Sequence, residues 1–387
     1  MLNSRTVVVG FIPLLDCAPL VVALEKGFAA EEGIDLTLVR ESSWANIRDR
    51  VVVGHFDAAH MLGPMAVAST LGIGHLKVPT IAPLSLGLGG NAITVSHSLW
   101  DAMTRQGARA GADPRSQGNA LQLVVRARER ENKPPLTFAM VYPFSAHNYE
   151  LRYWLAACGV DPDRDVRLLV IPPPLLVDAM REGQVDGFCV GEPWNSLAVS
   201  VGVGCIVAPT TAIWPLSAEK VLGCRLEWAQ RRPDLLAALI RSLYRAAQWC
   251  EAEPNQQELA MLLSQLRYVG APAAILQRGI ANRLRLQPEG ESVAIADFYL
   301  AARQQATFPW TSHALWFYSQ MIRWGQVAFS AGDLAQVRAT FRPDLYRLAL
   351  APLNVDLPAA DSRIEHGFFD GRTFDPDAFE AYLAQSL

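Results

Sequence analysis

The chain has 387 residues, more than one compact core usually holds, so two lobes with a cleft between them are expected. Hydrophobic residues make up 51% of the chain and charged residues 19%, a balance that excludes a disordered protein. The formal net charge of −4 provides no broad basic surface. Direct binding to nucleic acid is therefore not expected, and any link to RNA or DNA would run through a partner protein.

Short apolar strands alternate with helices at the start of the chain. An apolar run over residues 6–12 is typical of a buried strand, and 19–32 is expected to be a helix that begins near a proline and stops before a glycine. A second strand is predicted over 35–39, followed by a second helix over 44–53 that Ser43 can cap. This βαβα order favours a parallel sheet covered by helices.

A second series of strands and helices follows residue 95. It includes strands predicted over 137–141, 166–171 and 187–190, and the chain returns to the first lobe near residue 206. The first lobe is then expected to comprise residues 5–94 plus 207–387, and the second residues 95–206. Two crossings between lobes would make a hinge, on which such a protein opens and closes.

The last third of the chain is predicted to be mostly helical. Leucine, isoleucine and alanine side chains fall on one face of residues 233–251, which begin with a proline. Further helices are predicted over 254–268, 271–284, 294–306 and 312–325.

The cysteines show no metal-binding or disulfide pattern. The six cysteines are scattered, with no C-x-x-C pair, and most of them lie among apolar residues. They are Cys17, Cys158, Cys189, Cys205, Cys224 and Cys250. We expect free, buried thiols in a reducing compartment. The alternative is a pair of disulfides in a periplasmic protein.

The N-terminus has some features of a lipoprotein export signal, with Arg5, an apolar run over 7–15 and then Cys17. However, Pro13 interrupts the run, and Asp16 stands where a signal peptidase needs a small residue. The run is also too short to span a bilayer, and no other segment is long enough. A buried first strand, a cytoplasmic location and no membrane contact are therefore expected.

No sequence motif demands an enzyme, a cofactor or a metal. The phosphate-binding G-x-x-x-x-G-K-[ST], the G-x-S-x-G and the H-E-x-x-H patterns are all absent. The glycine-rich residues 87–91 lack the spacing of a dinucleotide loop, and His55 and His60 are not at a zinc spacing. We therefore predict a binding protein without catalytic residues, cofactor or metal.

Polar or amphipathic residues stand at the ends of several predicted strands, where open α/β sheets bind ligands. They are Trp44, Asn91, His147, Gly191 and Lys220. Structural roles are the alternative: core packing for Trp44, capping of a helix for His147, a solvated surface position for Lys220 and backbone geometry for Gly191. The neighbouring Glu192 is expected to start a helix.

Several motifs spread over nearly the whole chain resemble the nitrate- and bicarbonate-binding proteins of cyanobacterial-type ABC transporters. They include Gly-Phe-Ile-Pro at 10–13, Asp-Cys-Ala-Pro at 16–19 and the run Phe-Cys-Val-Gly-Glu-Pro-Trp-Asn at 188–195. The resemblance implies the α/β type II periplasmic-binding-protein fold: two lobes, a hinge, a ligand cleft between them, and a helical C-terminal part packed on the first lobe. It also implies nitrate contacts at Trp44, Asn91, His147, Gly191 and Lys220.

The chemistry of nitrate suits these residues. Nitrate is planar and monovalent and has no proton to donate, so it needs hydrogen-bond donors around its edge and a positive charge. Lys220 offers a cation, His147 and Trp44 offer ring N–H groups, and Asn91 offers an amide where the family usually has a glutamine. The bicarbonate binders resemble this chain too, but they need a carboxylate and a calcium ion where the nitrate binders have a lysine, so Lys220 favours nitrate or nitrite.

The absence of an export signal favours the family's cytoplasmic branch of nitrate and nitrite sensors. The resemblance implies a partner there, an RNA-binding antiterminator of the ANTAR type, which is released when the anion binds. The first alternative is the substrate-binding subunit of a nitrate, nitrite or bicarbonate ABC transporter. The second is an enzyme built on the same lobes, for which the sequence offers no catalytic set.

Overall fold

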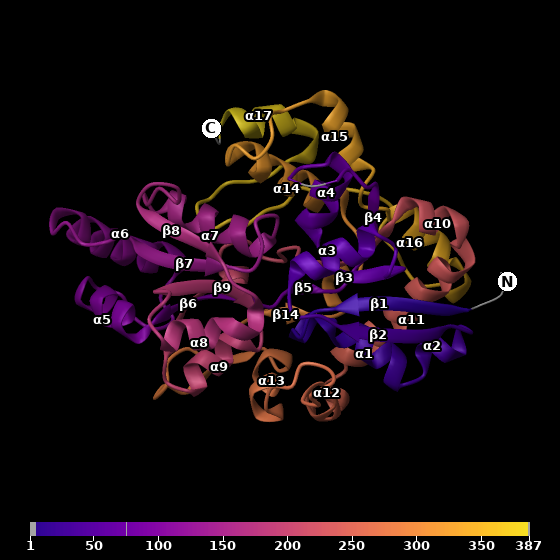
Figure 1. Ribbon diagram of the computed structural model, residues 1–387, viewed down its shortest axis with the longest axis horizontal. Coiled ribbons are helices and arrows are strands. Elements are labelled where there is room, and N and C mark those ends of the chain that lie inside the picture. Colours follow the sequence, from indigo (N-terminus) through magenta and orange to yellow (C-terminus); the bar gives the residue numbers. More distant parts are fainter. Residues whose placement is uncertain (1–4, 75, 386–387) are drawn as a thin grey trace.

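The structure is a computed structural model that describes residues 5–74 and 76–385, so residue 75 and the last two residues of the predicted first lobe lie outside it. Two five-stranded mixed sheets lie side by side, each covered by helices (Figure 1). The first has the order β2-β1-β3-β11-β4, with β1 Thr6–Phe11, β2 Asp35–Arg40, β3 Ala58–Leu62, β4 Thr80–Ser85 and β11 Lys220–Arg225. The second has the order β10-β6-β9-β7-β8, with β6 Asn91–Ser96, β7 Leu136–Met140, β8 Val166–Val170, β9 Gly187–Gly191 and β10 Gly204–Pro209.

Each sheet combines a parallel core with antiparallel strands. In the first sheet, β1 pairs in parallel with β2 and β3, while β11 returns antiparallel between β3 and β4. In the second sheet, β7 pairs in parallel with β8 and β9, and β6 runs antiparallel to β9 and β10. Strand β6, with which the chain enters the second sheet, begins at Asn91, and strand β11, with which it returns to the first sheet, begins at Lys220. Both starting points lie at the boundary between the sheets.

The chain crosses between the sheets twice, as the sequence predicts. One crossing lies between β4 and β6 and contains β5 (Leu88–Gly89), and the other lies between β10 and β11. The predicted boundaries at 94/95 and 206/207 cut through β6 and β10, whereas both strands lie wholly in the second sheet. An apolar run such as that of β6 does not reveal from sequence which sheet its strand joins.

The helices that follow β1 and β2 begin where local signals place them. Helix α3 (Trp44–Val52) starts after Ser43, whose hydroxyl oxygen accepts a hydrogen bond from the Asn46 N–H at 3.3 Å. The single helix predicted over 19–32 is instead two helices, α1 (Ala18–Glu25) and α2 (Phe28–Glu31). Gly27 separates them because its φ of 80° lies in the left-handed region, which ends a right-handed helix.

The other helices before β11 cover the two sheets. Helix α4 (Gly63–Leu71) follows β3 in the first lobe. The second lobe contains α5 (His97–Arg105), α6 (Pro114–Arg130), α7 (Ala146–Ala157), α8 (Leu176–Arg181) and α9 (Trp194–Ser200). Glu192 has the predicted role at a helix start, because its Oε2 accepts a hydrogen bond from the Ser196 N–H of α9 at 3.3 Å.

The C-terminal part is helical with one exception. Its helices are α10 (Leu226–Arg231), α11 (Pro233–Glu251), α12 (Gln256–Leu263), α13 (Ala273–Ile280), α14 (Thr311–Arg323), α15 (Ala331–Arg338), α16 (Pro343–Leu350) and α17 (Phe379–Ala384). The prediction of a helix over 294–306 is wrong. That stretch contains the end of the β12–β13 hairpin (Arg283–Arg285 with Ser292–Ala294) and β14 (Tyr299–Leu300), which pairs with β5. Asp297 and Gln304 adopt positive φ angles of 49° and 55°, which a continuous right-handed helix excludes.

The C-terminal part packs on the first lobe but also reaches the second. Helix α11 packs on α1, and α14 packs on α4 of the first lobe and on α7 of the second. The hydroxyl group of Tyr149 on α7 donates to Gln326 Oε1 at 2.7 Å, and that of Tyr153 donates to Asp370 at 2.8 Å. Figure 1 shows α14 and α17 above the junction of the two lobes. The C-terminal segment therefore links the lobes, in addition to the two crossings.

The six cysteines are buried and free. Across the described ranges, the structure contains no helix that combines the length and the hydropathy needed to cross a bilayer.

Glycine at position 118 allows α6 to pack closely on α7. A Cβ atom there would lie 2.7 Å from Cys158 Cβ and 3.3 Å from Trp154 Nε1. We expect Gly118→Ala to lower the free energy of unfolding by about 1–2 kcal/mol, because overpacking costs about 1–3 kcal/mol and alanine recovers part of this through its helix propensity. Urea denaturation measures the change.

The matched control is Gly332→Ala on the exposed helix α15, where the nearest atom to a new Cβ lies 3.6 Å away. We expect this variant to gain about 0.4–1 kcal/mol, because alanine restricts the unfolded chain. A loss of stability at both glycines, or at neither, would contradict this account of the α6–α7 contact.

Candidate functional site

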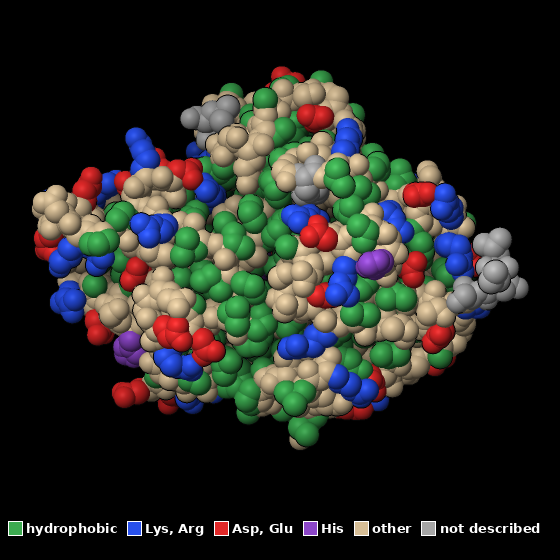
Figure 2. Space-filling model, viewed as in Figure 1, with side chains coloured by type: hydrophobic (Ala, Val, Ile, Leu, Met, Phe, Trp, Pro, Cys, Tyr) green, Lys and Arg blue, Asp and Glu red, His purple; other side chains and the backbone are tan. Residues whose placement is uncertain are grey.

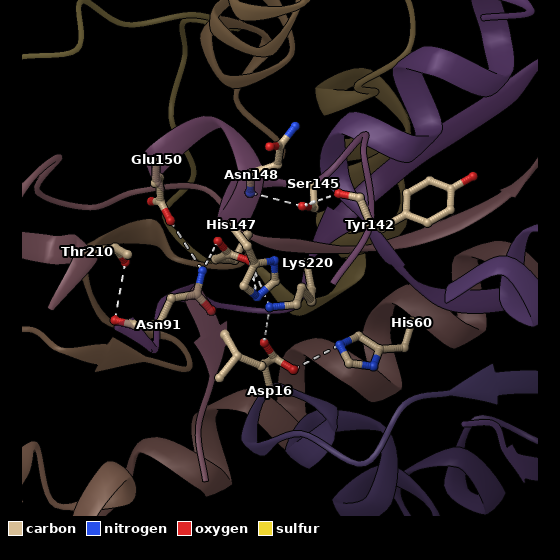
Figure 3. Close-up of polar contacts among 12 residues, drawn as sticks. Asp16, His60, Asn91, Tyr142, Ser145, His147, Asn148, Glu150, Thr210 and Lys220 are labelled. Atoms are coloured by element: carbon tan, nitrogen blue, oxygen red, sulfur yellow. Dashed lines mark hydrogen bonds and ion pairs between the residues drawn. The ribbon is translucent and has the colours of Figure 1, made fainter. Parts of the chain in front are cut away.

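The five residues predicted to bind the anion lie together at the boundary between the sheets. Each stands at the end of an element: Trp44 begins α3, Asn91 begins β6, His147 is the second residue of α7, Gly191 ends β9 and Lys220 begins β11. Three elements of the second lobe and two of the first supply them, and all five are buried. Figure 3 shows three of them, Asn91, His147 and Lys220, close together. The location agrees with the rule that ligands bind where the strands of such sheets end.

Lys220 is a buried cation held by two carboxylates. Its side chain has no exposed surface, and Nζ lies 2.7 Å from Asp16 Oδ2 and 2.7 Å from Glu219 Oε2. Burial alone would lower the pKa of Lys220, but the two carboxylates raise that pKa above its usual value. The lysine therefore stays charged, and a solvated surface position is excluded for it.

Asp16 connects Lys220 to His60. It lies in the 3-10 turn Leu15–Cys17, and its Oδ1 is 2.9 Å from His60 Nε2. Burial would raise the pKa of Asp16, but Lys220 and His60 hold it well below the usual range, so Asp16 is a carboxylate. His60 Nδ1 accepts a hydrogen bond from the Ile12 N–H at 3.3 Å, and burial lowers the pKa of His60, so the ring is neutral.

Trp44 packs on this group with its polar atom unpaired. Its ring meets that of His60 edge to face, with centroids 5.3 Å apart. The indole Nε1 is buried and has no hydrogen-bond partner in the part of the chain that the structure describes. Core packing therefore accounts for the ring of Trp44 but leaves its N–H without an acceptor, which is costly in a buried position.

Asn91 joins the two lobes through its side-chain amide. Its Nδ2 donates to Glu150 Oε2 of α7 at 3.3 Å and also to Glu219 Oε1. The amide oxygen of Asn91 has no partner. A Cβ atom on Gly191 would lie only 3.2 Å from that oxygen and 3.6 Å from Lys220 Nζ. Glycine at position 191 thus keeps the backbone close to the lysine.

His147 does not cap α7, because Ser145 does: the Ser145 hydroxyl oxygen accepts a hydrogen bond from the Asn148 N–H at 3.1 Å. Neither ring nitrogen of His147 has a hydrogen-bond partner within residues 5–74 and 76–385, and Nε2 lies 3.8 Å from Glu219 Oε2. Burial lowers the pKa of His147 well below its usual value, and Lys220 adds to that effect. His147 is therefore a neutral imidazole with one free N–H group facing the cluster.

Four residues of this cluster are not in the predicted set: Asp16, His60, Glu150 and Glu219. The sequence contains a signal for two of them. Glu219 directly precedes Lys220, and Glu150 stands three residues after His147, on the same face of α7. His60 and Asp16 gave no usable signal because their contact joins residues 44 positions apart.

The lobes touch on both sides of the cluster. On one side, the Leu15 N–H donates to the Glu192 carbonyl at 2.8 Å and Trp194 Nε1 donates to the Pro13 carbonyl at 3.2 Å. Elsewhere along the junction, Arg48 Nη1 donates to the Tyr142 hydroxyl group at 2.9 Å. Figure 2 shows hydrophobic side chains gathered over the centre of this face, at the junction of the lobes. A ligand would therefore reach the cluster only when the lobes separate.

The arrangement can hold a small polar ligand but offers no chemistry on it. Unpaired donors point into a buried cluster, and the nearby thiol of Cys189 is neutral because burial raises its pKa. Within the described ranges, no group of three or more His, Cys, Asp or Glu side chains is arranged to hold a metal ion. Fold and site together define a two-lobed ligand-binding protein, a class in which the lobes close on the ligand.

The comparisons with known proteins agree with this class. The NMT1-like family model matches residues 2–264, and the chain belongs to that family. It is 35% identical to the nitrate/nitrite binding protein NrtA of Synechococcus elongatus, over 98% of this chain and 85% of that protein. It is 32% identical to the bicarbonate-binding protein CmpA of the same species, over 100% of this chain and 87% of that one.

Some relatives are much longer than this chain. The nitrate import ATP-binding protein NrtC of Synechocystis is 36% identical, but the chain spans only 54% of its length. The relatives of matching length are named as binding proteins, and the prediction of a protein that is not an enzyme agrees with them.

The fold is shown directly by solved structures. The crystal structure of the periplasmic nitrate-binding protein NrtA from Synechocystis superimposes with a TM-score of 0.90 at 30% identity, over 100% of this chain and 99% of that one. An alkanesulfonate-binding protein from Xanthomonas axonopodis shares the fold at a TM-score of 0.56 and 16% identity. The predicted type II periplasmic-binding-protein fold is confirmed.

Asp16 is the counter-charge of a buried lysine, so its removal should destabilise the protein. We expect Asp16→Asn to lower the free energy of unfolding by about 3–5 kcal/mol, the usual cost of breaking a buried ion pair. The control is Asp49→Asn, because Asp49 pairs with Arg48 and its side chain is 61% exposed. There we expect a change below about 1 kcal/mol. Equal changes in the two urea-denaturation curves would show that Asp16 is not essential to a buried pair.

Proposed function

We propose that this protein binds nitrate or nitrite between its two lobes and acts as the substrate-binding component of an anion transporter. The observation that carries the proposal is the fully buried Lys220 at the boundary of the lobes, next to donors that have no acceptor. A cation and free N–H groups in a closed, water-poor site suit a small monovalent anion.

The donors are placed on different sides of the cluster. Trp44 Nε1 comes from the first lobe, and the ring of His147 comes from the second, so a ligand that accepts from both stabilises the closed form. Nitrate and nitrite have only acceptor atoms, which matches unpaired donors. Glycine at position 191 leaves the space beside Lys220 Nζ open to a ligand atom.

The names of the relatives support the same class of ligand. Proteins that the chain resembles at 32–36% identity are named for nitrate, nitrite or bicarbonate. Bicarbonate is the second candidate, because its single O–H group can donate to an acceptor such as the unpaired Oε1 of Glu150. Lys220 favours nitrate or nitrite, since the sequence resemblance links a lysine at this position to the nitrate binders.

Calorimetric titration with nitrate, nitrite, and bicarbonate with and without calcium tests the ligand. We expect Lys220→Ala to weaken nitrate binding at least about 100-fold, because truncating one partner of a buried charge pair costs about 2–5 kcal/mol. The control is Lys26→Ala, since Lys26 pairs with Glu258 on the outer surface of the first lobe, and it should bind like the parent. Parental affinity in the Lys220 variant would mean that the anion binds elsewhere.

The cellular role is proposed separately from the ligand. The relatives' names favour transport, whereas the cytoplasmic sensor with an ANTAR-type antiterminator as partner is a prediction from the sequence resemblance. A reporter fused behind the native N-terminus distinguishes an exported protein from a cytoplasmic one. For the sensor role, nitrate or nitrite should dissociate a purified complex with the antiterminator, and a complex that survives both anions would exclude that role.

A further inference from the structure

The buried cluster contains more carboxyl groups than cations. Asp16, Glu150 and Glu219 are here called the carboxyl cluster: Lys220 pairs with Asp16 and Glu219, and the amide of Asn91 donates to Glu150 and Glu219. Among the described side chains, Lys220 is the one ammonium group paired with any of the three. The three carboxyl residues are 5%, 0% and 2% exposed, so water does not screen them (Figure 3). A monovalent anion would add a further negative charge to a site that already lacks positive charge.

The other titratable groups that face the carboxyl cluster do not supply that charge. His60 on β3 and His147 on α7 are neutral, because burial lowers the pKa of each ring. Cys189 on β9 is a neutral thiol, since burial and the two glutamates raise its pKa. The missing charge has to come from outside the protein.

Glu150 and Glu219 are the groups placed to take up this positive charge, in the form of a proton. They come from different lobes, Glu150 from α7 and Glu219 from the segment before β11, and both accept from the same amide nitrogen of Asn91. Lobe closure therefore brings two like charges together while removing their water. Burial and the neighbouring carboxylate raise the pKa of Glu150 well above its usual value, and burial raises that of Glu219 to about 7 in spite of Lys220.

We propose that anion binding is coupled to proton uptake: as the lobes close, bulk solvent gives at least one proton to the Glu150–Glu219 pair. The O–H bond forms at a carboxylate oxygen, the proton leaves a water or buffer acid, and its positive charge balances the incoming monovalent anion. Glu150 Oε1 has no hydrogen-bond partner among the described residues, so a protonated Glu150 also offers an O–H donor to the anion. This inference rests on the proposed function and names the regulation of the same site.

The direction of the pH dependence follows from the raised pKa values. The protonated form is the one that closure favours, so binding weakens as the pH rises from the ordinary glutamate pKa of 4.5 to the raised pKa of the closed form, about 7 for Glu219, and levels off above the raised value. Each proton taken up makes the dissociation constant rise about ten-fold per pH unit.

Proton counting by calorimetry tests the proposal on the full chain. Nitrate is titrated at pH 5, 6, 7 and 8 in two buffers with different ionisation enthalpies, and the difference in heat gives the protons taken up per anion. We expect an uptake of about one proton near pH 6, between the ordinary and the raised glutamate pKa, and a dissociation constant that rises about ten-fold per pH unit there. Equal heats in both buffers with a flat affinity would overturn the coupling while leaving the proposed function intact. No heat with nitrate, nitrite or bicarbonate at any pH would refute both.

Matched glutamine variants locate the proton. Glutamine resembles a protonated glutamate in size and carries no charge, so Glu150→Gln and Glu219→Gln should still bind nitrate, take up fewer protons and show a shallower pH dependence. The control is Glu258→Gln, because Glu258 is 57% exposed and pairs with Lys26 on the surface of the first lobe, outside the carboxyl cluster. It should keep the parental count. A count that falls in the control and not in the two cluster variants would place the proton elsewhere and overturn the proposal.

Discussion

The buried ammonium group of Lys220 is the constraint on which the site depends. A charge with no exposed surface is stable only with counter-charges at hydrogen-bond distance, and Asp16 and Glu219 provide them at 2.7 Å each. Asp16 stands in the first turn after β1, so the ion pair ties the start of the chain to a strand that returns some 200 residues later. The same carboxylates then create the excess of negative charge that the second lobe meets on closure.

Much of the architecture could be predicted because local signals decide it. Ser43 and the residues after it look like a helix start, and the strand at 187–191 is an apolar run between glycines; both elements are where the sequence predicts them. The stretch 294–306 could not be predicted in this way. Its strand pairs with β5, more than 200 residues away in the sequence. Asp297 and Gln304 adopt left-handed backbone angles, and neither is a glycine, the residue that would have indicated such a conformation.

The residues of the site likewise divide into those that the sequence could indicate and those that it could not. Trp44, Asn91, His147, Gly191 and Lys220 stand at element ends, a position that sequence patterns and family resemblance can both indicate. Their binding role remains a prediction, but the structure brings all five together. The acidic partners were missed because the role of a carboxylate depends on its neighbours in space, which the sequence does not show. Asp16 in the sequence looks like an ordinary turn residue, and Glu150 like a helix surface residue. Neither burial nor protonation state can be read from residue type alone.

The contacts between the lobes separate into two kinds with different consequences. Backbone and indole hydrogen bonds, such as Leu15 to Glu192 and Trp194 to Pro13, carry no net charge and fix the geometry of the closed form at any pH. The Asn91 bridge between Glu150 and Glu219 joins like charges, so its contribution depends on what else enters the cluster. A ligand shifts closure only by its differential affinity for the closed state. In the proposed function, the neutral contacts therefore make closure possible, and the charge cluster makes it conditional on the anion.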